Sequence, residues 1–261
     1  MRILFIADIF AAPGRRMVEQ RLPRLRAERE IDVVVANAEN AADGVGITGR
    51  LADRLLASGV DLITLGNHAF RQREVYPYLG TQARIVRPAN YPDSAPGRGM
   101  ATATAADGTP VAVVNLLGKL FLDPAVSPFD VAEQLAAEAR GEAPVVIFDF
   151  HAEATSEKVA MGRLLDGRVT AVIGTHTHVQ TNDATVLPGG TAYMTDAGMT
   201  GPHDSVIGVQ TDLILRRFTT QMPVRFQPAD GDVRIEGALI ECDADGRATA
   251  IEPFRLRESE E

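Results

Sequence analysis

Short apolar runs rich in β-branched residues recur along this chain, and they constrain its fold more than any other feature. They lie at residues 3–6, 32–36, 62–65, 111–115, 145–148, 169–173 and 192–194. Most of them are nearly continuous in apolar character, which is typical of strands that helices bury on both faces. The runs therefore predict a layered α/β fold.

Helical patterns lie between several of these runs. Apolar spacing predicts helices over 16–30, 48–59, 127–140 and 155–167, with Thr48 as the N-cap of the second. Pro23 falls inside the first of these helices and predicts a kink there. No linker, repeat or low-complexity tract divides the chain, so we expect a single domain over residues 1–261.

The last third of the chain changes character. Strands are expected at 224–226, 233–241 and 248–254, because Asp230-Gly231 and Asp245-Gly246 are typical hairpin turns. Asp107-Gly108 marks a further hairpin earlier in the chain. The late antiparallel strands predict either a subunit interface, and with it a homo-oligomer, or a lid on the edge of the sheet.

Composition and charge exclude several classes of protein. Cys242 is the only cysteine, which excludes a disulfide framework and a cysteine-based zinc site and favours a reducing, cytoplasmic location. No apolar run is long enough for a signal peptide or a membrane span. The net charge of −9 disfavours long nucleic acid as a partner, so an anionic substrate must be attracted by local positive charge or by metal.

Polar side chains directly follow five of the apolar runs. In chain order the five runs are followed by Asp8; by Asn37, Glu39 and Asn40; by Asn67 and His68; by Asp149 and His151; and by His176 and His178. The carboxyl ends of the strands form the ligand crevice in an open α/β sheet. We therefore expect these side chains to meet in one site.

Each of these residues alone has a structural explanation. An aspartate or asparagine after a strand is usually a turn residue, and a single histidine is more often a structural group than a ligand. Their combination favours function, because four of the five histidines fall at strand ends together with Asp8 and Glu39. Imidazole and carboxylate ligands together suit Mn, Fe or Zn.

A competing motif is present at residues 44–49. Its sequence, Gly-Val-Gly-Ile-Thr-Gly, matches the G-x-G-x-x-G string of dinucleotide-binding proteins. Such a site needs an acidic residue at the end of the next strand, and the segment from Thr64 to Asn67 has none. We therefore interpret the glycines as a tight loop that leads to a helix cap. P-loop and nucleophile-elbow motifs are absent from the sequence.

The complete set of strand-end residues resembles the motifs of the calcineurin-like metallophosphoesterases. The matching blocks are Asp8, Glu39-Asn40, Gly66-Asn67-His68, His151 and residues 174–178. There are three departures from the usual motifs. Phe10 replaces the histidine of the first block, Ala-Glu-Asn-Ala at 38–41 replaces the usual Gly-Asp block, and Ala69 replaces a common acid.

With these departures, the chain is similar to a narrower group, the YmdB-type phosphodiesterases. The similarity rests on segments 6–9, 37–41, 87–92, 176–181 and 195–201, which span most of the chain. It implies the sheet sandwich of a metallophosphoesterase, with helices outside and antiparallel strands added near the C-terminus. It also implies an enzyme, a metal-dependent phosphoric diester hydrolase that acts on 2′,3′-cyclic nucleotides such as 2′,3′-cAMP at a dinuclear Fe or Mn centre.

The resemblance also implies a role for each motif residue. One metal ion would be held by Asp8, Glu39, Asn40 and His178, and the other by Glu39, Asn67, His151 and His176. Hydroxide formed at the two ions would attack the phosphorus, while His68 would stay off the metals and act as general acid. Asp149 has two equal interpretations, as a support for an imidazole or as a turn residue. His203 is a further candidate for a place near the site.

Two other functions stay open at this point. One is hydrolysis of a different phosphoester, such as a phosphomonoester, a 3′,5′-cyclic nucleotide or an RNA end. The other is a regulatory protein with incidental activity. A buried cluster of carboxylates and imidazoles is costly to keep without metal, which argues against an inactive site. The choice among phosphoesters rests on the family resemblance alone.

Overall fold

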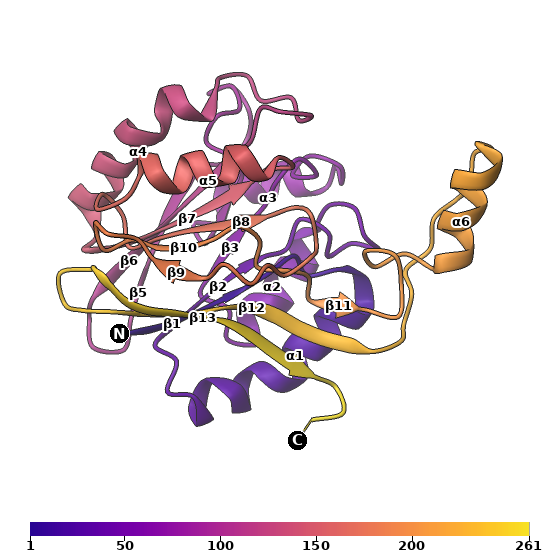
Figure 1. Ribbon diagram of the computed structural model, residues 1–261, viewed down its shortest axis with the longest axis horizontal. Helices are drawn as coiled ribbons and strands as arrows, with labels where there is room; N and C mark the ends of the chain where they lie inside the picture. The colour runs from indigo at the N-terminus through magenta and orange to yellow at the C-terminus, as the bar shows by residue number, and fades with distance from the viewer. Residues whose placement is uncertain (261) are drawn as a thin grey trace.

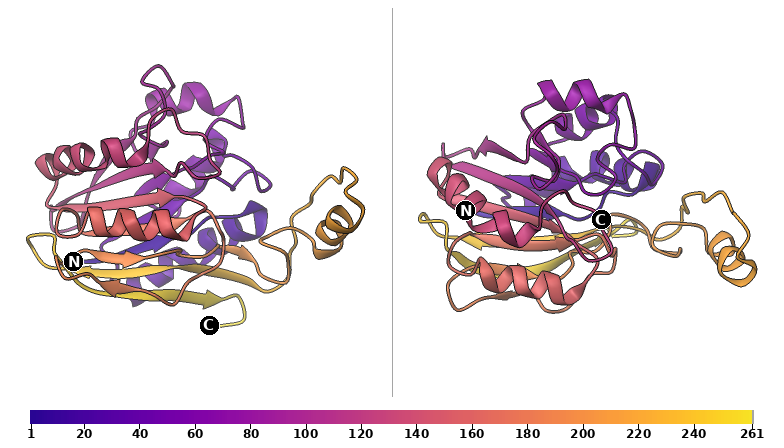
Figure 2. Two further views of the ribbon diagram at one scale, coloured as in Figure 1. Left: turned by 45° about the horizontal axis from the view of Figure 1, so that its top comes forward. Right: turned by 90° about the horizontal axis from the view of Figure 1, so that it is seen from above.

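The computed structural model describes residues 1–260 and consists of two β-sheets that face each other between outer helices (Figures 1 and 2). One sheet contains β1 (Arg2–Ile6), β2 (Val33–Asn37), β3 (Leu62–Thr64), β4 (Ile85–Val86), β11 (Gly201–Pro202), β12 (Val233–Cys242) and β13 (Ala248–Arg257). The other contains β5 (Met100–Thr104), β6 (Pro110–Leu117), β7 (Val145–His151), β8 (Ala171–Thr175), β9 (Thr185–Val186) and β10 (Ala192–Met194). The helices are α1 (Ala11–Glu28), α2 (Gly49–Ala57), α3 (Val75–Thr81), α4 (Pro128–Glu142), α5 (Thr155–Leu164) and α6 (Thr211–Thr220). The layered α/β sandwich expected from the sequence is confirmed.

Parallel strands form the centre of each sheet. The first sheet runs in the order β11-β12-β1-β2-β3-β4, with β1 to β4 parallel and β12 antiparallel to β1. The second runs in the order β5-β6-β7-β8-β10-β9, with β6, β7, β8 and β10 parallel. The antiparallel strands lie outside these parallel blocks, so the carboxyl ends of the parallel strands are free to carry a site.

Three clusters of buried apolar side chains fill the spaces between the layers. Successive side chains of a strand point to opposite faces, and in β1 Ile3 and Phe5 face the second sheet while Leu4 and Ile6 pack under α1 and α2. A third cluster joins the second sheet to α4 and α5. Burial on both faces, by a second sheet on one side and helices on the other, explains the continuous apolar character of these runs.

Several local predictions are confirmed. The glycine loop at 44–46 leads into α2, where the backbone N–H of Leu51 donates to the Thr48 hydroxyl at 3.3 Å as in an N-cap. Asp107-Gly108 and Asp245-Gly246 lie in the hairpins β5–β6 and β12–β13. Helix α1 continues through Pro23. Within residues 1–260, no helix combines the length and apolarity needed to cross a membrane.

The prediction of a strand at 224–226 is wrong. These residues have no paired strand, and the segment is mostly exposed. Asp230-Gly231 is therefore not a hairpin turn, and β12 pairs instead with β1, β11 and β13. The sequence analysis also missed α6, which stands away from the two sheets on a narrow connection in all three views (Figures 1 and 2).

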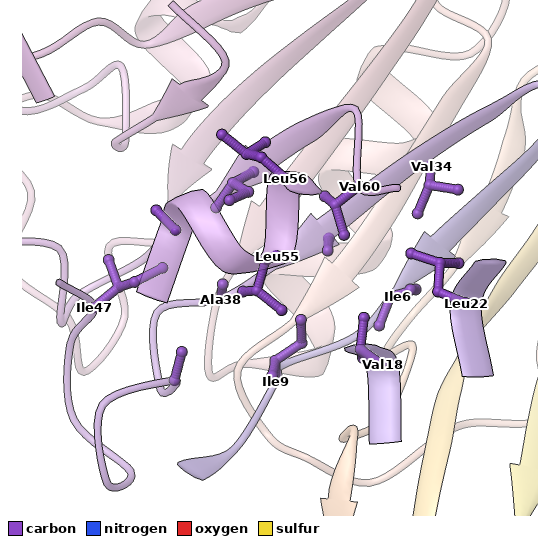
Figure 3. Packing of buried hydrophobic residues seen from close by; sticks show 14 of the residues in the cluster. Ile6, Ile9, Val18, Leu22, Val34, Ala38, Ile47, Leu55, Leu56 and Val60 are labelled. Carbon is purple, nitrogen blue, oxygen red and sulfur yellow. The ribbon is translucent and has the colours of Figure 1, made fainter. Parts of the chain in front are cut away.

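We expect Leu55→Ala to destabilise the protein. The Leu55 side chain is fully buried in the cluster beneath α2, between the helix and the first sheet (Figure 3). Its truncation leaves a cavity, and the free energy of unfolding should fall by about 2–5 kcal/mol. Urea denaturation measures this change. Val45→Ala is the matched control, because Val45 is exposed and its truncation should change stability by about 0.5 kcal/mol or less. Equal losses in the two variants would contradict the role of this cluster.

Candidate metal centre

The predicted strand-end residues meet where the carboxyl ends of the parallel strands of both sheets come together. The first sheet supplies those that follow β1, β2 and β3, and the second supplies those that end β7 or follow β8. One connected network of polar contacts joins Asp8, Glu39, Asn40, Asn67, His68, His151, His176 and His178. All eight residues to which the resemblance gives a metal-binding or acid role are thus brought together.

The tightest part of the network surrounds the Nε2 atom of His151, a fully buried side chain at the end of β7. Asn67 Oδ1 lies 3.0 Å from this nitrogen, Glu39 Oε1 lies 3.1 Å from it, and His176 Nδ1 also lies 3.1 Å from it. One ring nitrogen carries at most one hydrogen, which cannot satisfy three acceptor atoms. This crowding of ligand atoms is the arrangement that a bound cation resolves.

Glu39 lies between the two halves of the network. Its Oε2 accepts the backbone N–H of His68 at 2.8 Å, whereas its buried Oε1 has no hydrogen-bond partner. Oε1 nevertheless lies 3.2 Å from His68 Nδ1. A buried carboxylate oxygen without a hydrogen bond is costly unless a cation neutralises it. The orphan oxygen therefore fits a metal ligand.

The second half of the network contains Asp8, Asn40 and His178. The Nε2 atom of His178 lies 3.6 Å from Asp8 Oδ1 and 3.1 Å from Asn40 Nδ2, and the Nδ1 atom lies 3.1 Å from the carbonyl oxygen of Ile207. The remaining oxygen of Asp8 accepts the backbone N–H of His176 at 3.2 Å. Donation of a hydrogen bond from His178 Nδ1 to the Ile207 carbonyl oxygen places the ring proton on Nδ1 and leaves Nε2 free to face Asp8. The Ile207 carbonyl therefore sets the tautomer of His178.

The charges in the network are strongly coupled. Burial alone would raise the pKa of both carboxyl groups, but His151 and His68 hold the pKa of Glu39 well below its usual value and His178 lowers that of Asp8. Burial alone would lower the pKa of His151, but the neighbouring Glu39 carboxylate outweighs this effect and raises the pKa to about 9. Burial and the neighbouring His151 lower the pKa of His176 to about 3. Without metal the carboxylates are therefore ionised, the His176 ring is neutral and the His151 ring is protonated at pH 7, so a metal ion that binds here would displace the proton of His151.

Asp149 supports His151 through a hydrogen-bonded threonine. His151 Nδ1 lies 2.9 Å from the Thr175 hydroxyl, which donates to Asp149 Oδ1 at 2.6 Å. With the Thr175 hydroxyl as acceptor, the His151 proton sits on Nδ1 and Nε2 turns toward the network. Asp149 also accepts from Asn37 Nδ2 at 2.9 Å and from the Thr64 hydroxyl, and burial raises its pKa to about 6. It lies inside β7, so the alternative of a turn residue is wrong.

His176 and His178 are held in an uncommon backbone conformation. Their φ angles are 100° and 62°, in the left-handed region that residues other than glycine rarely adopt. Between them, Thr177 donates to Asp196 Oδ2 from its backbone N–H at 3.1 Å and from its hydroxyl at 2.6 Å. Lys158 Nζ donates to the same oxygen at 2.7 Å, and both side chains of this ion pair are buried.

Sequence reasoning missed these supporting residues. Asp196 stands in a segment that carries the family resemblance, yet no role was inferred for it, and Lys158 is one of only two lysines in a chain rich in arginine. Glu153 is a further addition, because its Oε2 lies 3.1 Å from His176 Nε2. His203 contacts Glu236, at 3.3 Å, in a cavity of about 380 Å³ that also borders His178.

Two facing sheets with carboxylate, amide and imidazole side chains gathered at their carboxyl edges are typical of the metallophosphoesterase fold class. Comparison with known proteins places it more narrowly. The family model described as "YmdB-like protein" matches residues 4–254. The chain belongs to this YmdB-like family.

Individual relatives agree with the family assignment. The chain is 47% identical to a 2′,3′-cyclic-nucleotide 2′-phosphodiesterase of Bacillus subtilis, over 93% of this chain and 92% of the relative. A hypothetical protein from Thermus thermophilus superposes with a TM-score of 0.92 and 44% identity, covering 99% of this chain and 100% of that one. A protein from Mycoplasma pneumoniae described as a novel phosphatase gives a TM-score of 0.91 and 31% identity, covering 100% and 94%.

We expect Lys158→Met to destabilise the protein strongly, because it leaves Asp196 buried without its cation. Breaking a buried ion pair costs about 3–5 kcal/mol of unfolding free energy. The matched control is Lys119→Met, which removes the other lysine from an exposed position and should cost about 0.5 kcal/mol or less. Chemical denaturation of both variants measures the difference. Similar stability of the two variants would contradict the structural role of the Lys158–Asp196 pair.

Proposed function

We propose that this protein hydrolyses 2′,3′-cyclic nucleotides at a dinuclear metal centre. The observation that carries the proposal is the convergence of three ligand atoms on His151 Nε2 beside the unpartnered Oε1 of Glu39. A metal-dependent hydrolase of phosphoric esters is the class to which such a site belongs. The substrate is inferred from the name of the Bacillus subtilis relative, which is 47% identical to this chain.

The proposed ligands form two sets that share Glu39. Asp8, Asn40 and His178 complete one set, and Asn67, His151 and His176 complete the other. Glu39, His151 and His176 alone offer three ligand atoms that lie within 4.8 Å of one another. Nitrogen and oxygen ligands without a thiolate suit Fe or Mn, and we propose one of these metals. The single cysteine supports the further proposal of a reducing, cytoplasmic location.

Asn40 links the proposed metal site to the proposed acid. In the structure its Oδ1 lies 2.7 Å from His68 Nδ1, and its Nδ2 faces Asp8 and His178. Ligation through Oδ1 requires a half-turn of this amide, after which Nδ2 faces the His68 ring and donates to Nδ1. The exchangeable proton of a neutral His68 is then on Nε2, where a leaving ribose oxygen can accept it.

The surroundings of His68 suit a general acid. Its side chain is 25% exposed, whereas that of His151 is fully buried, so His68 is the histidine of the two that a substrate can reach. The backbone N–H of His68 donates to Glu39 Oε2, and this hydrogen bond fixes His68 at the edge of the network. Bound divalent ions would neutralise phosphoryl charge and lower the pKa of water to about 7. Proton donation by His68 to the alkoxide leaving group supplies the complementary half of the reaction.

A second candidate substrate is a phosphomonoester. The relative from Mycoplasma pneumoniae is described as a phosphatase and shares the fold at a TM-score of 0.91. A comparison of 2′,3′-cAMP, 3′,5′-cAMP and a phosphomonoester under the same metal conditions distinguishes the two functions. Preferential turnover of the 2′,3′ ring supports the main proposal, and preferential turnover of the monoester overturns it.

We expect Glu39→Gln to lower the metal content of the purified protein from about two ions per chain to one or fewer, because both proposed ligand sets use this carboxylate. Elemental analysis after dialysis measures the ratio. Glu241→Gln serves as the control, since Glu241 pairs with Arg2 at a distant edge of the first sheet, and its metal content should match the wild type. Full metal occupancy in Glu39→Gln would overturn the proposed bridging role.

We expect His68→Ala to lose turnover of 2′,3′-cAMP by a factor of about 10²–10⁴, the usual contribution of a general acid. Metal content should stay at the wild-type ratio, because His68 is outside both ligand sets. Product release and elemental analysis on the same sample separate the two effects. Undiminished turnover in a metal-loaded variant would exclude His68 as the acid, and loss of metal would instead make it a ligand.

A further inference from the structure

The segment 87–92 carries part of the family resemblance, yet it supplies none of the candidate metal ligands. Two buried polar side chains fix its conformation. The guanidinium of Arg87 donates to the carbonyl oxygen of the residue that follows at 2.8 Å, and the amide of Asn90 donates to the Leu117 carbonyl oxygen at 2.7 Å. The backbone N–H of Leu117 donates back to Asn90 Oδ1 at 2.9 Å. The segment is therefore a rigid loop that holds its next residue, Tyr91, in a defined place.

Tyr91 lies in a group of aromatic rings beside the proposed general acid. Its ring centroid is 5.6 Å from that of Phe70, at an interplanar angle of 54°, and the Phe70 centroid is 5.7 Å from that of Tyr76. Phe70 follows His68 by two residues in the same turn, where the N–H of Arg71 donates to the His68 carbonyl oxygen at 3.0 Å. Phe70, Tyr76 and Tyr91 together are called the aromatic platform below.

The contacts of Tyr91 do not explain its position as a structural one. Its side chain is half-buried and belongs to none of the apolar clusters formed among residues 1–260. The other three tyrosines each form a hydrogen bond through the hydroxyl, whereas the Tyr91 hydroxyl has no such partner in the described part of the chain. Burial and the nearby Glu39 carboxylate raise the pKa of Tyr91, so the side chain is neutral at pH 7. A neutral aromatic ring is thus left available to a ligand at the edge of the candidate metal centre.

The place of the platform decides which part of a substrate it can meet. His68 is the proposed donor of a proton to the leaving ribose oxygen. In a 2′,3′-cyclic nucleotide the base is attached to the same five-membered sugar ring as that oxygen, so the base must lie close to His68. Aromatic side chains bind nucleobases by stacking on their π-faces. Three uncharged rings in this place suit the base and not the phosphate.

We propose that the aromatic platform is the nucleobase subsite and that the base of the substrate stacks on the Tyr91 ring. This inference rests on the proposed function, because it takes the position of the ribose from the role of His68. Every nucleobase has a π-face, so stacking tolerates different bases. The subsite therefore favours nucleotides over phosphoesters without a base, and it makes little distinction among the bases themselves.

Steady-state kinetics of the metal-loaded protein tests the proposal with two esters. One is 2′,3′-cAMP, and the other is glycerol 1,2-cyclic phosphate, which has the same five-membered cyclic phosphodiester but no base. Stacking stabilises the bound base equally before and in the transition state. Tyr91→Leu should therefore raise KM for 2′,3′-cAMP by about 5- to 150-fold without changing kcat. KM for the base-free ester should stay as in the wild type.

Two further variants separate stacking from other effects. Tyr91→Phe keeps the ring and should keep the low KM for 2′,3′-cAMP. Tyr78→Leu is the matched control, because Tyr78 is also half-buried but its hydroxyl donates to Asp53 of α2 at 2.7 Å, outside the platform. Metal content and thermal unfolding of each variant show that the metal centre and the fold are intact.

Three results would overturn the proposal. They are an unchanged KM for 2′,3′-cAMP in Tyr91→Leu, an equal loss on both esters, and a loss in Tyr91→Phe as large as that in Tyr91→Leu, since the hydroxyl would then be the contact. A wild type that turns over neither ester contradicts the proposed function instead. Calorimetric titration then decides the subsite by comparing adenosine 3′-monophosphate with inorganic phosphate. The nucleotide should bind the wild type more tightly than phosphate does, and Tyr91→Leu should abolish the difference, whereas equal binding of both to the wild type overturns the subsite.

Discussion

A single buried carboxylate ties the two sheets together at the edge that carries the candidate metal centre. Asp149 belongs to the second sheet, and it accepts hydrogen bonds from Asn37 and Thr64 of the first sheet as well as from Thr175 of its own. A buried acidic group is tolerated only when its oxygens are satisfied. The relative position of the sheets is thereby fixed where the candidate ligands that follow β2 and β3 meet those of β7 and β8. Through Thr175 the same carboxylate also orients the His151 ring.

The same constraint explains the conformation of the segment after β8. A positive φ at two histidines is unfavourable, and it persists only where surrounding contacts over-determine it. Those contacts are the Lys158–Asp196 pair, which holds Thr177, and the Asp8 oxygen that accepts the N–H of His176. Both involve buried carboxylates, so the charges proposed to bind metal and the charges that shape the loop after β8 form one interdependent set.

The strand ends could be predicted from the sequence because their signal is local. A continuous apolar run shows where a strand is buried, and the first polar residue after it shows where the strand ends, as at Asp8 and Asn67. The partners of those residues could not be predicted, because Asn37 and Asp149 are 112 residues apart and meet only through the facing of two sheets. The prediction of a strand at 224–226 is wrong because it rests on residue type alone. The β-branched and aromatic residues there have no neighbouring strand to pair with.

Phe226 and its neighbours are apolar without being part of the core, because they lie in the segment 211–226, which carries α6 away from both sheets (Figure 1). The connection that leads to α6 also contacts a candidate metal ligand, because the Ile207 carbonyl oxygen lies 3.1 Å from His178 Nδ1. Next to it, a Cβ at Gly208 would collide with the Phe10 ring at 2.7 Å, so this connection passes tightly over the site. Residues 207 and 208 therefore hold the tautomer and the position of His178 and also connect α6 to the two sheets.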